Sequence, residues 1–528
     1  MALIASILMQ LPYEFNSTLY LSIVVGIISI LLVLNLTRRS KSINLPPSPP
    51  KLPFIGNLHQ VGTLPHSSFK ELSNKHGPLM FLQLGQIPTV VISSADVAKE
   101  IIRNHDIVFS NRPQTTAANI FLYGCKDIGF APYGEEWRQK RKVCVLELLS
   151  LKRVKSFLPI RKQEVEELVT TIRKACSREG SSLSSPSRVI NLSDLMIATS
   201  NNIVSRCVLG QKYDLPDGSD HASFGDLGRK LMGKLTQFCV GDFFPSLGWI
   251  DVVRGLISEI NAIFVELDSF LNGVVEEHKK KKKNNIDDDN SNKDFVDILL
   301  HLQEKGMLDF ELTQADLKAI LTDMFVGGSD TTSTTLEWTF AELLRKPKTM
   351  KKLQEEIRRI VGNKSKLDEN DINQMNYLKC VIKESLRLHP PLPVILPRQT
   401  TSNSKIKGYD IPSKTTVYLN VWAIQRDPEL WENPEEFIPE RFESVQIDFK
   451  GQDFQLMPFG TGRRGCIGIS FGLASTEIIL ANLLYWFDWK LPSENGDKIM
   501  QNIDMSEMSG ITVGKKVPLL LRPIPYSH

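Results

Sequence analysis

Residues 458–468, PFGTGRRGCIG, are the stretch of the sequence that decides between two folds. Gly460, Gly462 and Gly465 within it spell a complete GxGxxG, and Cys466 follows directly. The glycines are consistent with a dinucleotide-binding turn, in which they let the backbone approach a pyrophosphate. They are equally consistent with a loop that wraps around Cys466 and supports its sulfur. The two interpretations predict different proteins.

The dinucleotide interpretation requires a strand before the glycines, a helix after them and an acidic residue about 20 positions on, within a βαβ unit. Locally the sequence offers a strand at 454–459, an apolar helix at 469–487 and then Asp488. Only about 60 residues follow Gly465, which are too few to complete a sheet of several βα units. The sequence therefore disfavours a dinucleotide site.

The composition is that of an ordinary folded protein with a large core. The chain has 528 residues, 42% of them hydrophobic, and a formal net charge of only +3. This near balance gives no global indication of nucleic-acid binding. The seven cysteines include no CxxC pair, which argues against a disulfide framework or a zinc site and fits a reducing compartment. One cysteine with a special role is compatible with this pattern.

The first 57 residues differ from the rest of the chain. Residues 19–36, LYLSIVVGIISILLVLNL, contain no charged residue and are followed at once by the basic cluster 38–41. Their length is close to the ~20 residues that cross a bilayer, and the cations favour the cytosolic side. The chain start lacks a basic n-region, so a retained anchor is favoured over a cleaved signal peptide or a buried core helix. We predict three parts: an anchor at 1–36, a basic and proline-rich hinge at 37–57, and a cytosolic body at 58–528.

The remaining pattern predicts a mainly α fold with small β-sheets. Residues 79–92 and 405–419 each read as short strands around a glycine turn. Helical spacing predominates elsewhere, most clearly at 165–174, 256–277, 349–361 and 376–388. Exposed loops are expected at the Ser-rich stretch 177–188 and at 276–294, where five consecutive lysines indicate a solvated helix end and not a nucleic-acid site.

A second unusual stretch, VGGSDTTSTT at 326–335, interrupts a long apolar helical pattern. Each mid-helix glycine costs ~1 kcal/mol relative to alanine, and Ser and Thr compete for backbone hydrogen bonds. Gly327 and Gly328 would let a bulky planar group or a small ligand approach the helix. Asp330 and Thr331 would offer an acid and an alcohol for proton delivery. The alternative is a kinked helix with an exposed, hydroxyl-rich face.

Three shorter motifs carry charged side chains, and each alone has an ordinary structural interpretation. KESLRLHPP contains Glu384 and Arg387, PERF adds Arg441, and WRQKR contains Trp137 and Arg141. Surface pairs at such spacing are common and weak. Taken with the two stretches above, the order along the chain is WxxxR, GGxDTT, ExxR, PERF and FxxGxRxCxG.

This ordered set resembles the cytochrome P450 family over nearly everything after the anchor. The anchor, the proline-rich hinge and the residues of the motifs are most similar to those of plant A-type members located in the endoplasmic reticulum. The resemblance implies a cytochrome P450 fold preceded by one transmembrane helix, with haem b (iron protoporphyrin IX) as the cofactor. Cys466 as thiolate would be the axial iron ligand, in a cradle that includes Phe459, Gly460 and Gly468. Its place at the start of an apolar helix agrees, because free amides and the helix dipole favour an anion.

The resemblance assigns roles to the other motif residues. Four side chains would hold the haem propionates, for which the arginine fork is suited: Trp137, Arg141, Arg398 and Arg464. Three would form a buried structural network: Glu384, Arg387 and Arg441. Asp330 and Thr331 would organise water and deliver protons during oxygen activation.

One residue departs from the family pattern. Ile467 follows the cysteine where plant members commonly have proline. Its amide proton is expected to add a hydrogen bond to the thiolate and to leave haem binding intact.

Electrons are expected from NADPH through a separate flavoprotein, NADPH-cytochrome P450 reductase, since the sequence has no flavin motif. Five basic residues would form its docking face: Arg138, Lys140, Arg141, Lys142 and Arg463.

The sequence thus predicts a single-pass monooxygenase of the endoplasmic reticulum membrane, with its haem-binding catalytic domain in the cytosol. It would use O2 to oxidise a small lipophilic plant metabolite, such as a terpenoid, an alkaloid or a phenolic or coumarin-like compound. By analogy with the family, six residues are expected at the substrate: Ile120, Met324, Gly327, Val394, Ile395 and Met508. Two alternatives are a haem-thiolate dehydratase or isomerase, for example on aldoximes, and a non-catalytic membrane-tethered haem sensor.

Overall fold

Helices form most of the fold, as the sequence predicts. The structure is a computed structural model that describes residues 22–30, 43–177, 189–213, 224–284, 293–306, 308–492 and 503–526. The helices of the body are α3 (Pro65–His76), α4 (Ala95–Asn104), α5 (Thr116–Phe121), α6 (Glu135–Val143), α7 (Leu151–Ser156), α8 (Leu158–Ser177), α9 (Leu192–Leu209), α10 (Phe224–Leu235), α11 (Val240–Phe243), α12 (Trp249–Val253), α13 (Leu256–Asn284), α14 (Phe295–Glu304), α15 (Gln314–Arg345), α16 (Pro347–Val361), α17 (Glu369–Gln374), α18 (Asn376–Leu388), α19 (Val421–Ile424), α20 (Arg441–Ser444) and α21 (Ile469–Trp486).

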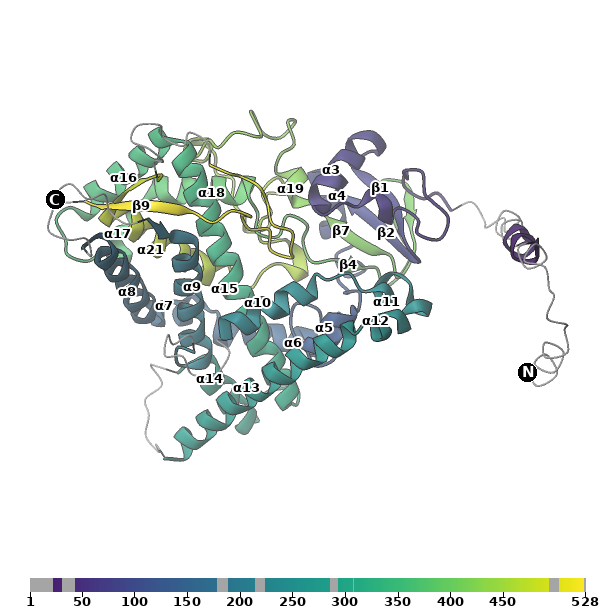
Figure 1. Ribbon diagram of the computed structural model, residues 1–528, viewed down its shortest axis with the longest axis horizontal. Coiled ribbons are helices and arrows are strands. Elements are labelled where there is room, and N and C mark those ends of the chain that lie inside the picture. The colour runs from purple at the N-terminus through teal and green to yellow at the C-terminus, as the bar shows by residue number, and fades with distance from the viewer. Residues whose placement is uncertain are drawn as a thin grey trace.

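The strands lie in three small sheets. The first sheet has four strands in the order β1 (Leu79–Leu84), β2 (Ile87–Ile92), β7 (Thr416–Leu419), β4 (Arg398–Gln399). The second has three strands in the order β3 (Ile190–Asn191), β9 (Leu520–Pro525), β8 (Phe487–Lys490). In the third, β5 (Ser404–Ile406) pairs with β6 (Tyr409–Ile411). Strands β1 and β2 form an antiparallel hairpin, and β2 pairs in parallel with β7, from Thr89 opposite Thr416. The expected strands at 79–92 and 405–419 are thus confirmed. Figure 1 shows this sheet with α3 and α4 at one end of the body and most of the long helices at the other.

Helix α15 is the centre of the helical region. Thr313 and Asp316 form a capping box at its start, so that two of its free amide groups are satisfied. The helix packs along α9, α18 and α21. A β-carbon on Gly328 would lie only 3.1 Å from the Val204 side chain of α9, so Gly328 lets the two helices approach closely. The helix that the apolar pattern around 326–335 predicts is confirmed.

Two of the local expectations need comment. Residues 454–459 form turns and no strand, because Met457 and Gly460 enter a tight loop in which the Gly460 amide donates to the Met457 carbonyl. That strand prediction was wrong, and with it the local support for a dinucleotide fold is lost. The five lysines at 279–283 extend α13, which confirms the solvated helix end. Nearly all of the expected loop 177–188 lies outside the described residues.

The proline-rich segment packs against the body. The Pro47 carbonyl accepts a hydrogen bond of 2.8 Å from Phe81 of β1. Asn57 is buried and pairs with Gln83 of the same strand, through hydrogen bonds of 2.6 and 2.8 Å. Residues 43–51 have no helix, as five nearby prolines require. This segment therefore fixes the point where the chain leaves the body toward its N-terminus.

The predicted anchor lies largely outside the described residues. Of it, 22–30 form a helix whose apolar side chains are exposed, which is inconsistent with a buried core helix. In the part of the chain that the structure describes, α21 is the one helix long and apolar enough to cross a membrane, and it is mostly buried in the core.

Candidate functional site

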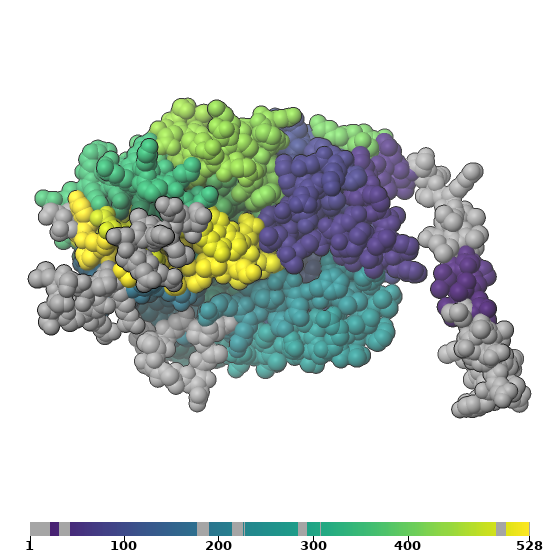
Figure 2. Space-filling model, turned by 45° about the horizontal axis from the view of Figure 1, so that its top comes forward, coloured from purple at the N-terminus to yellow at the C-terminus, as the bar shows by residue number. Residues whose placement is uncertain are grey.

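A cavity of about 330 Å³ lies between the loop 458–468 and helix α15. Its walls come from α9, α10, the segment 391–396 and the start of α21, and they are mostly apolar. The turn at 511–512 closes one side. This turn is held by its neighbours, because Glu507 accepts a hydrogen bond of 2.8 Å from His66 of α3. Figure 2 shows the C-terminal segment, in yellow, beside the N-terminal region, in purple.

The loop 458–468 forms the floor of the cavity and presents Cys466 to it. Gly460 and Gly462 have φ angles of 67° and 68°, in the left-handed region that glycine adopts without strain. The Cys466 amide donates to the Phe459 carbonyl at 2.9 Å, which closes the loop. The expected turns at Gly460 and Gly462 are confirmed.

The thiol of Cys466 is accessible because it opens onto the cavity. Desolvation by the surrounding protein raises the pKa of Cys466, and the Gly468 amide and the Arg141 guanidinium oppose that rise. The Gly468 amide donates to Sγ at 3.3 Å. Among the described residues the Ile467 amide makes no such bond, so the hydrogen bond expected from Ile467 comes from Gly468 instead. A thiolate here needs a positive centre in the cavity, such as a metal ion.

Buried arginines stand beside the floor. Arg464 donates to the carbonyls of Ser110, Ile128 and Ala131, and Arg112 donates to those of Gly129, Leu396 and Pro397. Neither makes an ion pair with any described residue. Desolvation and repulsion by Arg464 and Arg398 lower the pKa of Arg112 well below its usual range, and desolvation and repulsion by Arg398 and Arg141 lower that of Arg464 to about 9. Two cations without an ion pair next to a cavity call for an anion within it.

Trp137 and Arg398, the other two predicted propionate partners, lie behind the residues that line the cavity. Trp137 donates from Nε1 to the Ile128 carbonyl at 3.0 Å, and the Arg464 guanidinium lies 4.1 Å from its ring centroid. Arg398 pairs with Asp106 at 2.9 Å and donates to the Thr461 carbonyl. Only Arg141 and Arg464 of the predicted set line the cavity. Arg112 also lines it, and the sequence reasoning missed it because no motif includes it.

A thiol, guanidiniums without an ion pair and an apolar cavity fit a planar, dianionic metal cofactor. A haem would place its metal at Cys466 and its propionates toward Arg112, Arg141 and Arg464. The backbone of Gly327 leaves room opposite, because a β-carbon added there would meet no atom within 4 Å. The donor set and the shape of the site therefore agree with haem.

Helix α15 forms the roof of the cavity. Thr331 lines it and donates to the Gly327 carbonyl at 2.7 Å, one turn back. Asp330 does not line the cavity; burial raises its pKa, and the nearby Thr512 hydroxyl partly offsets that rise. Most of the hydroxyl-rich stretch is buried, so the expected alternative of an exposed face is wrong. Both glycines line the cavity, and Gly328 in addition lets α15 pack closely on Val204 of α9.

The predicted structural network is present. Glu384 and Arg387 are fully buried, with two bonds of 2.8 and 2.9 Å between them, and Arg441 donates to the same carboxylate at 3.0 Å. Arg387 also donates to the carbonyls of Gln425, Pro434 and Glu436. Because every donor is satisfied, the group fixes the segment that precedes the cysteine loop.

The six expected substrate residues fall into two groups. Three line the cavity: Met324, Gly327 and Ile395. Three do not: Ile120, Val394 and Met508. Val394 packs beside strands β1 and β2, and Met508 is 55% exposed, whereas the following Ile511 and Thr512 face inward. Within a turn, residues only one to a few positions apart can face toward or away from the cavity. Sequence spacing does not tell which of them faces it.

The expected reductase-docking face is only partly exposed. Lys140 is buried and pairs with Asp316 at 2.6 Å, and Arg141 turns toward the cavity. Neither therefore belongs to a docking surface, and that part of the prediction was wrong. Three of the set are exposed: Arg138, Lys142 and Arg463.

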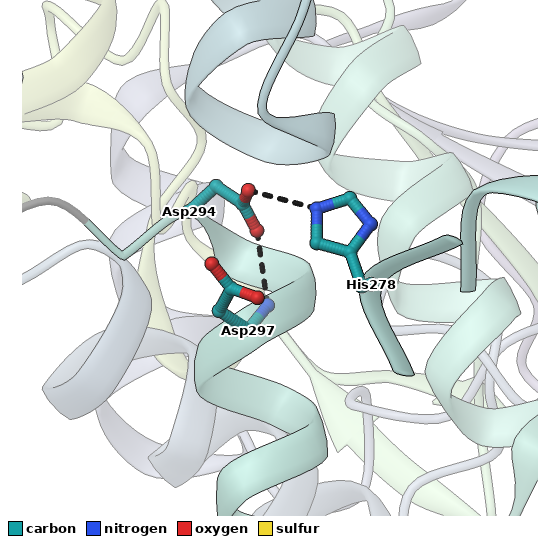
Figure 3. Close-up of side chains that lie close together, drawn as sticks. All are labelled: His278, Asp294 and Asp297. Carbon is teal, nitrogen blue, oxygen red and sulfur yellow. Dashed lines mark hydrogen bonds and ion pairs between the residues drawn. The ribbon is translucent and has the colours of Figure 1, made fainter. Parts of the chain in front are cut away.

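One further group of metal-ligating side chains occurs among the described residues, at His278, Asp294 and Asp297. Figure 3 shows that it joins the end of α13 to the start of α14. Asp294 caps α14 through the Asp297 amide and accepts from His278 at 2.9 Å, while the other His278 nitrogen meets the Val274 carbonyl. Both ring nitrogens of His278 and both carboxylate oxygens of Asp294 are already hydrogen-bonded within the protein. These bonds account for the cluster as a helix cap.

Comparisons with known proteins agree with this site. The family model described as Cytochrome P450 matches residues 46–514. Phenylacetaldehyde oxime monooxygenase from Prunus mume is 52% identical over 506 residues, which cover 95% of this chain and 94% of the relative. Cytochrome P450 71A1 from Persea americana is 50% identical over 466 residues, covering 88% and 90%.

A zebra fish cytochrome P450 solved with abiraterone has the same fold, with a TM-score of 0.72 and 24% identity, and covers 88% of this chain and all of its own. The fold, the cysteine loop and these relatives agree. The chain therefore belongs to the cytochrome P450 family, among its plant A-type members, and is a cytochrome P450 monooxygenase.

Proposed function

We propose that the protein binds haem b through Cys466 and oxidises a small lipophilic plant metabolite with electrons from NADPH. The observation that carries this proposal is the joint placement, around one cavity, of an accessible thiol and the guanidiniums of Arg112 and Arg464, which make no ion pair with any described residue. Haem, when bound, would supply oxygen activation at its metal. The remaining work falls to side chains of the chain itself.

The residues around the haem would bind, orient and exclude water. Arg112, Arg141 and Arg464 would hold the propionates, and Trp137 would support Arg464 from behind. Thr331 would position a water molecule in the cavity, since its hydroxyl oxygen can still accept while it donates to Gly327. Asp330 would hold a proton near neutral pH more readily than an exposed carboxyl, because burial raises its pKa.

The substrate class is proposed from the lining and from one relative. Apolar side chains of α9, α10 and α15 make up most of the cavity wall beyond the haem space. Phenylacetaldehyde oxime monooxygenase, at 52% identity, is named for an aromatic aldoxime. An aromatic aldoxime is therefore the first substrate to test, ahead of terpenoids, alkaloids and coumarin-like phenolics. Aldoxime dehydration without oxygen insertion is the second candidate activity.

We also propose a single-pass anchor at 1–36 in the endoplasmic reticulum membrane, a hinge at 37–57 and a cytosolic catalytic domain at 58–528. Large apolar side chains are exposed where the chain leaves the body, at Phe54 and, on α12, at Trp249 and Val253. These two segments lie side by side, because the β1–β2 turn bonds to Ile55 at Gly85 and to Phe243 at Gln86. Such a patch suits contact with lipid.

The partner would be NADPH-cytochrome P450 reductase. Arg138, Lys142 and Arg463 remain exposed and would offer a basic docking face to an acidic flavoprotein domain. Raising the salt concentration should then slow electron transfer, because exposed charge pairs are screened.

The test is a turnover assay with the full-length membrane protein, a plant reductase and NADPH under isotopically labelled dioxygen. Phenylacetaldehyde oxime and a pool of plant metabolites are supplied, and products are identified by mass spectrometry. Labelled product establishes monooxygenation and names the substrate. Label-free product formed without NADPH would instead establish the dehydratase activity, and a haem protein without any turnover would leave the sensor alternative.

A further inference from the structure

Two buried aspartates, which no motif includes, stand between the arginines and helix α15. Asp323 lies on α15 and lines the cavity, and its Oδ2 accepts from the amides of Ile128 and Gly129 at 2.6 and 3.0 Å. Asp127 is fully buried, and its Oδ2 accepts from the Phe130 amide at 2.6 Å. The two carboxyl groups therefore hold four consecutive residues, 127–130, from both sides.

The carboxyl groups also face one another. A β-carbon on Gly129 would lie 3.2 Å from Asp127 Oδ2 and 3.7 Å from Asp323 Oδ1, so both groups meet beside this one residue. The second oxygen of Asp127 is buried without any hydrogen-bond partner. Two ionised carboxylates cannot share such a place, because like charges at short range in a buried site repel strongly. A proton between them removes the repulsion and gives the orphan oxygen a role.

The segment that these aspartates hold is the one that holds the haem-side arginines. The Gly129 carbonyl accepts from Arg112 at 2.8 Å. The Ile128 carbonyl accepts from Arg464 at 3.2 Å and from Trp137 at 3.0 Å. The amides of the same two residues point to Asp323, so one side chain orients two peptide groups whose carbonyls orient two guanidiniums.

We propose that Asp127 and Asp323 form a carboxyl pair that shares one proton and positions the segment 127–130, and through it Arg112 and Arg464, for the anionic side of the haem. They are positioning residues, since they act through the arginines. The proposal rests on haem binding as proposed above. The pKa directions agree with it: burial raises the pKa of both aspartates above the usual range, and the charge of Asp127 raises that of Asp323 further.

Two guanidiniums and two thiols face the pair from the elements packed against it. Arg112 and Arg464 lie nearby as cations. The thiols of Cys125 and Cys144 lie near the carboxylates, and burial raises the pKa of both thiols, so they stay neutral near pH 7. One net negative charge on the pair therefore partly balances two cations, and leaves the remainder of their charge for the propionates.

The first experiment compares the pH dependence of thermal unfolding in the wild-type holoenzyme, Asp127→Asn and Asp323→Asn. A carboxyl whose pKa is raised in the folded state costs increasing stability as the pH rises from its unfolded pKa through its folded pKa. The wild type should therefore lose stability toward alkaline pH. An asparagine carries a permanent N–H where the proton sat, and its oxygen still accepts from the backbone. Each variant should flatten the fall and exceed the wild type by roughly 2–4 °C at the alkaline end.

Asp96→Asn, at an exposed position on α4, is the matched control and should follow the wild type. Variants at Asp127 and Asp323 that show the wild-type slope, with no alkaline gain, would overturn the shared proton.

The second experiment measures the rate at which haem leaves the folded protein for an excess of apomyoglobin. Asp323→Ala removes the acceptor of two amides and should release haem at least about tenfold faster than the wild type. Asp323→Asn should restore retention to within about twofold of the wild type, because its oxygen replaces that acceptor. Equal release from Asp323→Ala and the wild type would overturn the positioning role.

If Asp323→Ala does not fold, Asp323→Asn and Asp127→Asn still decide the proposal through the pH comparison. A wild-type chain that takes up no haem would overturn the proposed function, and the pH comparison would still support or overturn the carboxyl pair by itself.

Discussion

The floor and the roof of the cavity meet their hydrogen-bonding needs in opposite ways. On the floor, Arg112 and Arg464 bond only to carbonyl groups and make no ion pair with any described residue. On the roof, Thr331, Thr332 and Thr335 each donate to the carbonyl one turn back, so the helix satisfies its own hydroxyls. The floor therefore requires a charged ligand and the roof does not. Haem binding should depend on the charge of the floor, and substrate choice on the shape of the roof.

Replacing Cys466 should have the largest effect on the floor. Cys466→Ser leaves a hydroxyl that does not ionise near neutral pH, so turnover should fall by at least about a thousandfold. The optical spectrum of the reduced carbon monoxide complex should lose its thiolate signature. Cys176→Ser, a half-buried cysteine at the end of α8, is the control. A thiolate spectrum retained in Cys466→Ser would refute the ligand assignment and the comparison with it.

Removing one charge from the floor should weaken haem binding without touching the roof. Arg464→Met should release haem about 10–100-fold faster, because a hydrogen bond to a charged group is worth about 1.5–3 kcal/mol. The neighbouring Arg463 is half exposed and makes its contacts at the surface, so Arg463→Met should retain haem like the wild type. Similar release from both variants would show that the floor is not the electrostatic site that the comparison requires.

The roof should respond in catalysis and not in haem content. Thr331→Ala removes a hydroxyl from the cavity wall, and a water molecule can partly replace it. The product formed per NADPH should therefore fall about tenfold, which is less than the 10²–10⁴-fold loss in rate expected when a general acid is removed. Haem content should stay at the wild-type level. Ser333→Ala, buried two residues on and outside the cavity lining, is the control. Loss of haem from Thr331→Ala would contradict the division between floor and roof.

Much of the floor could be predicted from sequence, and the roof only in part. The cysteine loop is a local motif in which backbone conformation dictates glycine, so Gly460, Gly462 and Cys466 could be placed without a structure. Arg112 could not, because its role depends on carbonyl groups more than 280 residues away at Leu396 and Pro397. Such contacts leave no periodicity or spacing in the sequence.

The substrate residues show the same limit on the roof. The family resemblance places Met324 and Gly327 of α15 at the substrate, and both line the cavity. In the turns at 394–395 and 508–512, by contrast, neighbouring residues face opposite ways, and Val394 and Met508 point out of the site. A helix repeats its geometry, whereas a turn does not, so only the first is predictable by counting.

The two glycines of the roof give the smallest and sharpest test. Both lie inside α15, where glycine costs ~1 kcal/mol relative to alanine. A β-carbon at Gly327 would meet no atom within 4 Å, whereas one at Gly328 would press on Val204 at 3.1 Å. Gly327→Ala should therefore raise the free energy of unfolding by up to about 1 kcal/mol and change only substrate affinity, since the new methyl enters the cavity. Gly328→Ala should gain less stability, because Val204 must move, and should change substrate affinity less than Gly327→Ala, because its methyl points at Val204 and not into open space. A larger effect on substrate affinity from Gly328→Ala would mean that the substrate lies against the α9 wall of the cavity and not beneath Gly327.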